Sequence, residues 1–329
     1  MTANTVNGGG KGARSGAQTL LLLAAPLNLP ILRALAEGPK RQVELRYETG
    51  YPAQTTLRAQ LRRLAEIEAI EGQRRNRFPG MLEYELTANG RELLLVAVTL
   101  ERWLEKAPGG PLPLGANAAK AAIKALAEGW STTMLRAVAA RPMSLTELDR
   151  VIGSLSYPSL ERRLSALRLA GLVESQAGNG RGTPYSPTGW LRHGMAPLIA
   201  AARWERRRRS RLTAPVGPID VEATMLLALP LLSLPPELSG TCRMAAEVPN
   251  ADRRLAGTIV EVEGGAVASC STSMRGNPGA WALGSVPAWL SAMIESDLSG
   301  LELGGDYELA RALIDGLHRS LFWECLQNV

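Results

Sequence analysis

Two groups of hydrogen-bonding and cationic side chains stand at the start of two leucine-striped segments of this 329-residue chain. The groups are Gln54, Thr55, Thr56, Arg58 and Arg62, and then Ser156, Tyr157, Ser159, Arg162 and Arg163. Amide, hydroxyl and guanidinium groups donate hydrogen bonds, and arginine pairs with planar acceptors through two parallel bonds. These residue types favour recognition of a polyanion with a patterned edge, such as the major groove of a duplex.

More arginines follow each segment, in a polar stretch between two strand-like sequences. Arg74, Arg75 and Arg77 belong to the first stretch, GQRRNRFPG, and Arg181 belongs to the second, QAGNGRGTP. A basic hairpin tip suits the phosphates or the narrow minor groove of a duplex. We therefore predict that both groups and both tips contact double-stranded DNA.

The elements that must position these residues occur twice in the chain. The segment LRAQLRRLAEIEAIEG, which starts at Leu57, returns 103 positions later as LERRLSALRLAGLVES, which starts at Leu160. Further along, Tyr84 and Tyr185 preserve an offset of 101. A common period that includes the flanking sequences is typical of a duplicated domain.

Each copy has the pattern of a helical DNA-binding module. Leu57, Leu61 and Leu64 follow the i, i+4, i+7 spacing of one buried helical stripe, and the arginines lie on the other side. Two shorter helical segments precede this helix, and a strand, a basic tip and a second strand follow it. This order predicts a winged helix-turn-helix with a closing helix that carries Trp103 or Trp204.

The first copy resembles the HxlR family of bacterial transcription regulators. The resemblance lies in ILRALAEGPKRQVELRYETG, in the leucine-spaced helix and in LEYELTANGREL. The second copy retains Tyr185 and Thr188 but loses the rest of that last motif. The resemblance implies a DNA-binding module whose single-domain relatives act as homodimers. For a chain with two copies we therefore expect a homodimer, with a monomeric pseudo-dimer as the alternative.

The last third of the chain has a different character. Six arginines and fourteen acidic residues follow Val216, although the whole chain carries a net charge of +6. Alternating apolar and polar residues predict strands, with a hairpin turn at Gly264 and Gly265. Ser285 and Asp306 are predicted to cap two helices, which gives an α+β domain.

This acidic part resembles the sterol-carrier-protein domain in AWALGSVPAWLSAMIESDLSGLELGGDYELARALIDGLHRSLF. The resemblance implies an apolar tunnel for a lipid-like molecule. Large flexible apolar side chains of this domain are the candidates for lining an effector pocket. They are Met244, Met274, Trp281, Trp289, Met293 and Trp323.

We therefore expect a mainly α protein with small β elements. The expected parts are a disordered tail at 1–18, a winged helix domain at 19–105, a linker at 106–117, a second winged helix domain at 118–212 and an α+β effector domain at 216–329. Three cysteines without metal-ligand spacing and two histidines favour reduced thiols and no metal site. We find no catalytic motif and expect no enzyme activity and no cofactor.

The predicted function is that of a cytoplasmic bacterial transcription regulator. A small apolar effector would shift the relative placement of the two DNA-reading helices. Double-stranded DNA and the effector are the expected partners, and no membrane partner is expected. Two alternatives remain open: a tandem winged-helix protein of replication or chromosome organisation, and a carrier of a lipid-like ligand.

Overall fold

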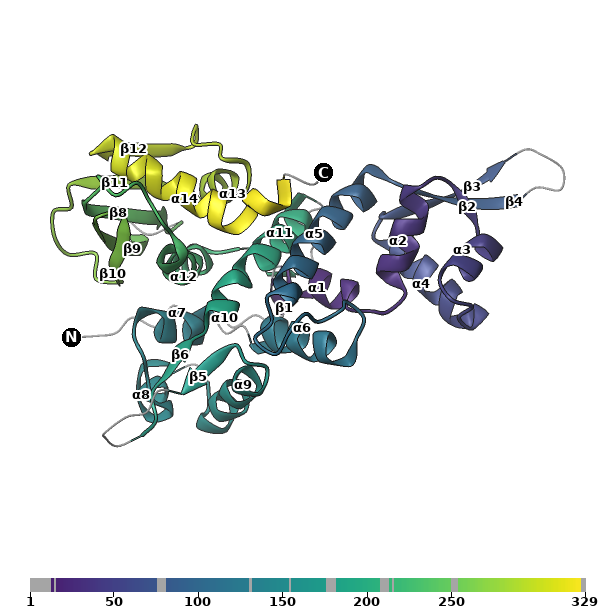
Figure 1. Cartoon of the computed structure of the whole chain (residues 1–329), viewed down its shortest axis with the longest axis horizontal. Helices are drawn as coiled ribbons and strands as arrows, with labels where there is room; N and C mark the ends of the chain where they lie inside the picture. The colour runs from purple at the N-terminus through teal and green to yellow at the C-terminus, as the bar shows by residue number, and fades with distance from the viewer. Residues whose placement is uncertain are drawn as a thin grey trace.

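Helices predominate in this protein, and its strands form small sheets (Figure 1). This agrees with the predicted fold class of a mainly α chain with small β elements. The computed structural model describes residues 13–14, 16–75, 81–129, 132–153, 155–175, 182–207, 213–214, 216–249 and 254–326.

The first unit is a group of helices closed by a three-stranded antiparallel sheet of order β2-β4-β3. Its elements are α1 (Ala17–Leu23), α2 (Asn28–Ala36), β2 (Lys40–Arg41), α3 (Gln42–Glu48), α4 (Gln54–Glu66), β3 (Ile70–Arg75), β4 (Met81–Leu86) and α5 (Ala88–Glu105). Leu57, Leu61 and Leu64 of α4 are buried, so the predicted stripe is confirmed.

The elements of the second unit have a similar order, except that its described residues form no counterpart of strand β2 and that it has two helices where the first unit has α5. They are α6 (Asn117–Gly129), α7 (Thr132–Ala140), α8 (Leu145–Val151), α9 (Tyr157–Leu169), β5 (Val173–Ser175), β6 (Tyr185–Pro187), α10 (Gly189–His193) and α11 (Met195–Arg207). A bridge between Met143 and Tyr185 occupies the place of the β2–β4 pairing. The stripe that begins at Leu160 is buried as well.

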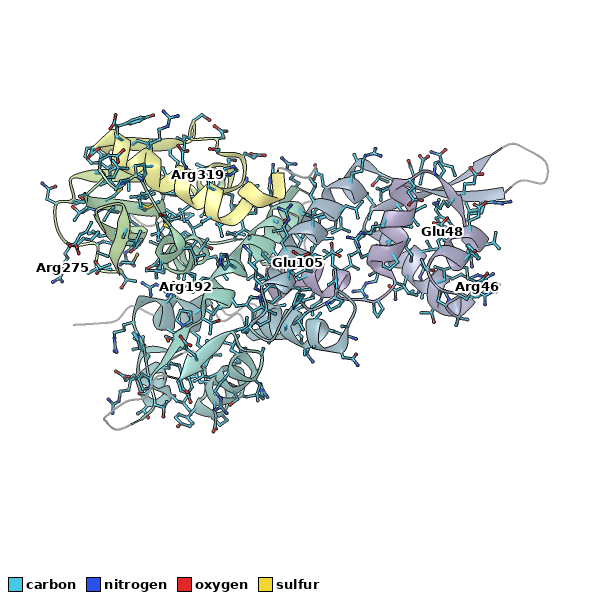
Figure 2. All side chains as sticks on the ribbon, viewed as in Figure 1. Arg46, Glu48, Glu105, Arg192, Arg275 and Arg319 are labelled. Carbon is cyan, nitrogen blue, oxygen red and sulfur yellow. The ribbon has the colours of Figure 1, made fainter. Side chains whose placement is uncertain are left out.

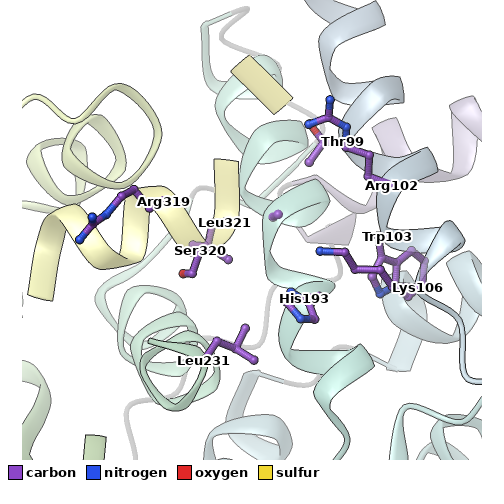
Figure 3. A pocket seen from close by; sticks show the side chains of 10 residues that line it. Thr99, Arg102, Trp103, Lys106, His193, Leu231, Arg319, Ser320 and Leu321 are labelled. Carbon is purple, nitrogen blue, oxygen red and sulfur yellow. The ribbon is translucent and has the colours of Figure 1, made fainter. Parts of the chain in front are cut away.

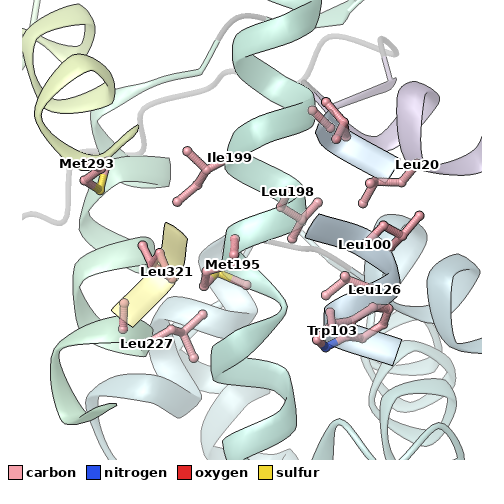
Figure 4. Close-up of a cluster of buried hydrophobic side chains, with 14 of the residues drawn as sticks. Leu20, Leu100, Trp103, Leu126, Met195, Leu198, Ile199, Leu227, Met293 and Leu321 are labelled. Carbon is pink, nitrogen blue, oxygen red and sulfur yellow. The ribbon is translucent and has the colours of Figure 1, made fainter. Parts of the chain in front are cut away.

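The two units share a cluster of buried side chains, which includes Leu100 and Trp103 of α5 and Leu198 of α11 (Figure 4). Tryptophans also form hydrogen bonds between the units. The rings of Trp103 and Trp190 stack with centroids 4.7 Å apart, and each indole Nε1 donates to the other residue's carbonyl, at 2.9 and 2.8 Å. At the offset of 101, Trp103 corresponds to Trp204 and Trp190 corresponds to Asn89. Trp204 Nε1 donates to the Asn89 carbonyl at 3.1 Å. A tryptophan of each unit therefore donates to the corresponding carbonyl of the other unit, as in an isologous interface.

Helix α1 is held by a residue from the far end of the second unit. Glu205 of α11 is 4% exposed, and its carboxylate accepts the backbone N–H of Gly16 at 2.7 Å and of Thr19 at 3.0 Å. The hydroxyl of Thr19 donates to the same carboxylate at 2.7 Å. A carboxylate at a helix N-terminus satisfies donors that have no partner within the helix. The expected tail at 1–18 therefore overlaps a helix that begins at Ala17.

The third unit is a five-stranded sheet of order β10-β9-β8-β11-β12, whose one face is covered by helices (Figure 1). Only β11 and β8 run parallel. Its elements are α12 (Pro218–Ala228), a 3₁₀ turn at Leu229–Leu231, β8 (Gly240–Glu247), β9 (Leu255–Glu263), β10 (Ala266–Ser271), β11 (Ala280–Gly284), α13 (Val286–Glu295), β12 (Leu301–Gly305) and α14 (Tyr307–Leu326).

Three local predictions for this unit are confirmed. Gly264 and Gly265 form the turn between β9 and β10, with φ of 54° and 78°. Left-handed backbone at both positions is what a two-residue hairpin turn requires. Ser285 caps α13 through a bond from the Ala288 N–H at 3.4 Å, and Asp306 Oδ1 accepts the Leu309 N–H at 3.1 Å.

Buried polar contacts attach the third unit to the second. Arg192 of α10 donates to the carbonyls of Leu226 and Leu227, at 3.2 and 3.1 Å, in the last turn of α12 (Figure 2). Burial lowers the pKa of this guanidinium. Arg136 Nε of α7 lies 2.8 Å from Glu222 Oε1 of α12, whose side chain is 3% exposed. Arg192 lies at the C-terminal end of α12, where the helix dipole favours a positive charge.

The helices do not offer a simple membrane span. Within the described ranges, no single helix combines the length and apolarity that a crossing requires. Helices α1 and α2 reach that length only as a pair bent by 80°, and most of their apolar residues are buried.

Candidate nucleic-acid interface

The leucine stripe determines which side of α4 faces solvent. Because Leu57, Leu61 and Leu64 are in the core, the residues between them point outward. All the candidates on this helix are exposed, namely Gln54, Thr55, Thr56, Arg58 and Arg62. Three of these residues line a shallow groove along the helix together with Ala59. They are Thr55, Arg58 and Arg62.

Two cations of this face are one helical turn apart. Arg58 and Arg62 are at i and i+4, so both guanidinium groups lie on the same side. Arg62 also lies 3.6 Å from Glu66, and both side chains are largely exposed. An exposed ion pair of this kind contributes little. It leaves Arg62 able to turn toward a phosphate.

The turn that leads into α4 has a defined backbone. Gly50 and Tyr51 have φ of 81° and 56°, in the left-handed region. Arg46 Nε donates to the carbonyl of Pro52 at 3.0 Å, and its guanidinium lies 5.9 Å from the centre of the Tyr51 ring. These contacts keep a costly conformation in place and direct the start of α4 toward solvent.

The helix before α4 and the helix before α9 each begin at a glutamate cap. In the first unit the Arg41 N–H donates to Glu44 Oε2 at 2.7 Å, and in the second the Ser144 N–H donates to Glu147 Oε2 at 2.8 Å. The Arg41 side chain lowers the pKa of Glu44. Glu44 and Glu147, which are 103 positions apart, therefore make the same capping motif in the two units, with a structural role.

Acid is expected to remove the Glu147 cap. The Ser144 N–H and the Arg141 guanidinium lower the pKa of Glu147 from 4.5 to about 2. Because the folded pKa is depressed, the stabilisation is complete above pH 4.5 and is lost as the pH falls toward 2. Glu147→Gln should therefore lower the unfolding midpoint at pH 7 and have a smaller effect at pH 3. Urea unfolding at both pH values measures this, with Glu161→Gln on α9 as the control. An effect that does not depend on pH would contradict it.

The wing residues are only partly described. Arg74 and Arg75 belong to β3, which pairs with β4 from Ile70 to Arg75. Their side chains lie outside the described part of the structure, as does Arg77. The strand places Arg74 and Arg75 on the hairpin that projects beyond α4 (Figure 1).

The corresponding face of the second unit carries fewer exposed cations among the described residues. Ser156, Tyr157 and Arg162 are exposed, whereas Ser159 and Arg163 are half-buried. Ser156 directly precedes α9, and Ser159 lies in the first turn of that helix. The Ser156 hydroxyl donates to the Ser159 hydroxyl at 3.1 Å. Arg181 lies outside the described residues.

Some candidate effector residues lie in the core of the third unit. Met244, Trp289 and Met293 are fully buried on the helix-covered face of the sheet. The Trp289 indole donates to the Ala245 carbonyl at 2.8 Å. Tight packing of this set accounts for their burial without a bound molecule.

The other candidates lie elsewhere. Trp281 is the register partner of Arg243 on β8 and of Gly304 on β12, on the opposite face of the sheet. Arg243 Nη2 donates to the carbonyl of Met274 at 3.4 Å, so Met274 is near that same face. Trp323 is in α14, and its side chain lies outside the described part. The sheet thus separates the described candidates into two groups.

The two thiols that the structure describes are poorly suited to chemistry at neutral pH. Burial raises the pKa of Cys242 to about 12 and that of Cys270 to about 11. The thiolate is the reactive form, so both side chains are expected to be inert. Within the described ranges, no three histidine, cysteine or acidic side chains gather as a metal site would require.

Comparison with known families agrees with the geometry of the first unit, that of a helix-turn-helix domain. Residues 25–108, which include α2 through α5, match the model of the HxlR-like helix-turn-helix family. This family consists of DNA-binding transcription regulators, so the match supports that class of function for this part of the chain. No curated protein matches the chain.

Several residues that join the units were not anticipated from the sequence. Trp103 and Trp204 stand out as equivalent positions of the repeat, but nothing nearby indicates Trp190 as their counterpart. Glu205 lies in the arginine-rich end of α11 and Arg192 lies in the short helix α10, and from the sequence both charged residues are expected at the surface. Their partners are many positions away, and local patterns carry no signal of such contacts.

Proposed function

We propose that this chain is a cytoplasmic DNA-binding transcription regulator. The observation that carries the proposal is the exposed face of α4, where Arg58 and Arg62 lie above a buried leucine stripe in the HxlR-like region. A helix with this face fits the major groove, where arginine pairs with guanine and glutamine with adenine. The arginines of the β3–β4 hairpin would then contact the flanking phosphates.

The second unit is proposed to be a second winged helix-turn-helix that presents α9. The reciprocal bonds of Trp103 and Trp204 to equivalent positions support a pseudo-dimer within one chain. Because α4 and α9 carry different side chains, the two halves would read different sequences. We therefore propose a monomer that binds an asymmetric bipartite site, in preference to a homodimer.

The third unit is proposed to be a sterol-carrier-like sensor of a small apolar ligand. Its buried methionine and tryptophan side chains, among them Met244, Trp289 and Met293, are adaptable enough to repack around such a molecule. Its attachment to α7 and α10 through Glu222 and Leu226 offers a route from the ligand to the second unit. The ligand would act by differential affinity for two arrangements of the units.

Loss of two arginines from α4 is expected to weaken specific DNA binding strongly. Each good arginine–base pair contributes roughly 1–3 kcal/mol, so Arg58→Ala with Arg62→Ala should weaken binding about 100-fold. The target is a duplex selected by the full chain from a random pool. Electrophoretic mobility shifts at several salt concentrations give the affinity, and the mass of the complex gives the number of bound chains.

The matched control removes two positive charges from the third unit, through Arg275→Ala with Arg311→Ala. Both residues are exposed there, so the control tests net charge alone. The control should bind as the parent does. If both double variants lose affinity equally, or if the parent selects no sequence, the proposed function is wrong.

A further inference from the structure

Two exposed tyrosines lie directly before α4, the helix that carries Arg58 and Arg62. Tyr47 of α3 is 67% exposed, and Tyr51, in the turn between α3 and α4, is 62% exposed. Their rings meet edge to face, with centroids 5.5 Å apart. An exposed cluster of large side chains with apolar rings marks a contact with another molecule more often than isolated ones do. We call Tyr47 and Tyr51 the tyrosine pair.

The backbone and a neighbouring cation fix the direction of the Tyr51 ring. Its φ of 56° is in the left-handed region, which is uncommon and costly for a residue with a large side chain. The Arg46 guanidinium packs on the ring, and its Nε donates to the Pro52 carbonyl. Backbone strain that the surroundings hold in place is concentrated at binding sites, where it orients a side chain before the ligand arrives.

The tyrosine pair lies far from the place where the three units join. In Figure 2, Arg46 lies at the end of the first unit that points away from the other two. The junction of the units contains a cavity of about 270 Å³ between α5, α11 and α14 (Figure 3). Helix α3 and the turn after it, which the structure describes in full, do not line that cavity. The pair therefore faces outward, beside the start of α4.

The groups around the pair are compatible with an anionic partner. Both carboxylates of α3, Glu44 and Glu48, are paired with a cation. Arg46 adds a positive charge beside the Tyr51 ring. Among the described residues, neither tyrosine hydroxyl has a hydrogen-bond partner. Each hydroxyl can therefore donate a hydrogen bond to a partner molecule.

The second unit carries an arginine at the place of Tyr47. At the offset of 103, the buried Leu45 corresponds to the buried Leu148, and Tyr47 corresponds to Arg150, which is exposed. The fold of the repeated unit therefore does not need a tyrosine at this position. Tyrosine and arginine side chains both donate hydrogen bonds to phosphate oxygens in complexes with DNA. The exchange of one for the other favours phosphate as the partner of this position.

We propose that the hydroxyls of Tyr47 and Tyr51 donate hydrogen bonds to phosphates of the DNA backbone beside the groove that α4 enters. This inference deepens the proposed function and rests on it. In helix-turn-helix proteins the first helix of the pair crosses the backbone, and the second lies in the major groove. Helices α3 and α4 occur in that order. Phosphate contacts position a protein on the duplex without reading its sequence, so the tyrosine pair orients α4 while Arg58 and Arg62 contact the bases.

The experiment compares the affinity of the full chain for the duplex selected from a random pool with that for an unrelated duplex of equal length. Tyr47→Phe and Tyr51→Phe retain the rings and lose only the hydroxyls. Each should weaken binding to both duplexes about fivefold, the effect of one hydrogen bond. Because tyrosine is uncharged, the slope of log affinity against log salt should remain that of the parent. The control is Tyr307→Phe, an exposed tyrosine of the third unit, which should bind as the parent does.

A second measurement locates the contact on the DNA. Single phosphates of the selected duplex are replaced by uncharged methylphosphonates, one position at a time. At the phosphate that meets a tyrosine, the replacement should weaken binding of the parent more than binding of the corresponding phenylalanine variant. At every other position the parent and the variant should lose the same factor. Circular dichroism confirms that the variants are folded.

Three results would overturn the inference. They are phenylalanine variants that bind both duplexes as the parent does, losses confined to the selected duplex, and an equal loss in Tyr307→Phe. Normal binding by both phenylalanine variants would overturn this inference alone and would favour a protein as the partner of the tyrosine pair. A parent chain that binds no duplex would overturn the proposed function as well.

Discussion

Trp103→Ala is expected to lower the free energy of unfolding by about 3–5 kcal/mol, the range for removing a buried tryptophan. Trp103 is 2% exposed and stacks on Trp190, so its removal leaves a large void between the first two units. It also removes the indole donor of the Trp190 carbonyl. Urea unfolding followed by circular dichroism measures the loss, in the transition that includes these units.

Two conservative variants separate packing from hydrogen bonding. Trp103→Phe retains an aromatic ring and loses the bond to Trp190, so it should cost much less than alanine. Trp204→Phe loses the bond that Trp204 donates to the Asn89 carbonyl of the first unit. A single hydrogen bond contributes about 1 kcal/mol. If Trp103→Ala unfolds with the parent's midpoint, the tryptophan pair does not hold the units together.

Arg136→Met is expected to destabilise the junction between α7 and α12 by about 3 kcal/mol, the lower end of the range for breaking a buried ion pair. The lower end applies because the Arg136 side chain is 38% exposed, whereas that of Glu222 is 3% exposed. The variant leaves a buried carboxylate without its cation. Urea unfolding and limited proteolysis between the second and third units should both report the change.

The pH dependence of this loss has a defined sign. Burial raises the pKa of Glu222, and Arg136 partly offsets that effect. Without Arg136 the pKa rises further, so Glu222 takes up a proton more readily in the folded state. The folded state then gains stability as the pH falls from neutral toward the ordinary value of 4.5. The cost of Arg136→Met should therefore shrink over that interval.

The double variant Arg136→Met with Glu222→Leu is the control for this junction. Replacing both members of a buried pair by apolar side chains is often close to neutral. The double variant should therefore recover most of the stability that Arg136→Met loses, at every pH. A double variant as unstable as the single one would mean that the ion pair is not the cause.

Local features of this protein could be predicted from its sequence. The buried stripes that begin at Leu57 and Leu160 follow from helical periodicity, and the Gly264–Gly265 turn follows from the backbone that glycine permits. The Asp306 cap follows from the three-residue reach of its side chain. Each signal lies within a few residues, where chain geometry alone decides which groups can meet.

The exposed face of α4 could likewise be predicted from the sequence. Once the stripe is in the core, Arg58 and Arg62 must face solvent, so their exposure is a consequence of spacing. The sequence did not predict as clearly which residues of the second unit are exposed. Arg163 and Ser159 of α9 are half-buried, because the neighbouring elements partly cover that helix. Spacing identifies a face but not what covers it.

The sequence alone determined the periodic elements, their order and the exposed arginines opposite each leucine stripe, because those depend on interactions between near neighbours. Only the tertiary structure decided how the units join. Trp103 meets Trp190 across 87 positions, and Glu205 meets Thr19 across 186. The cavity beside Arg102 forms where separate elements dock. Such contacts depend on the packing of whole surfaces, which no local pattern of residues encodes.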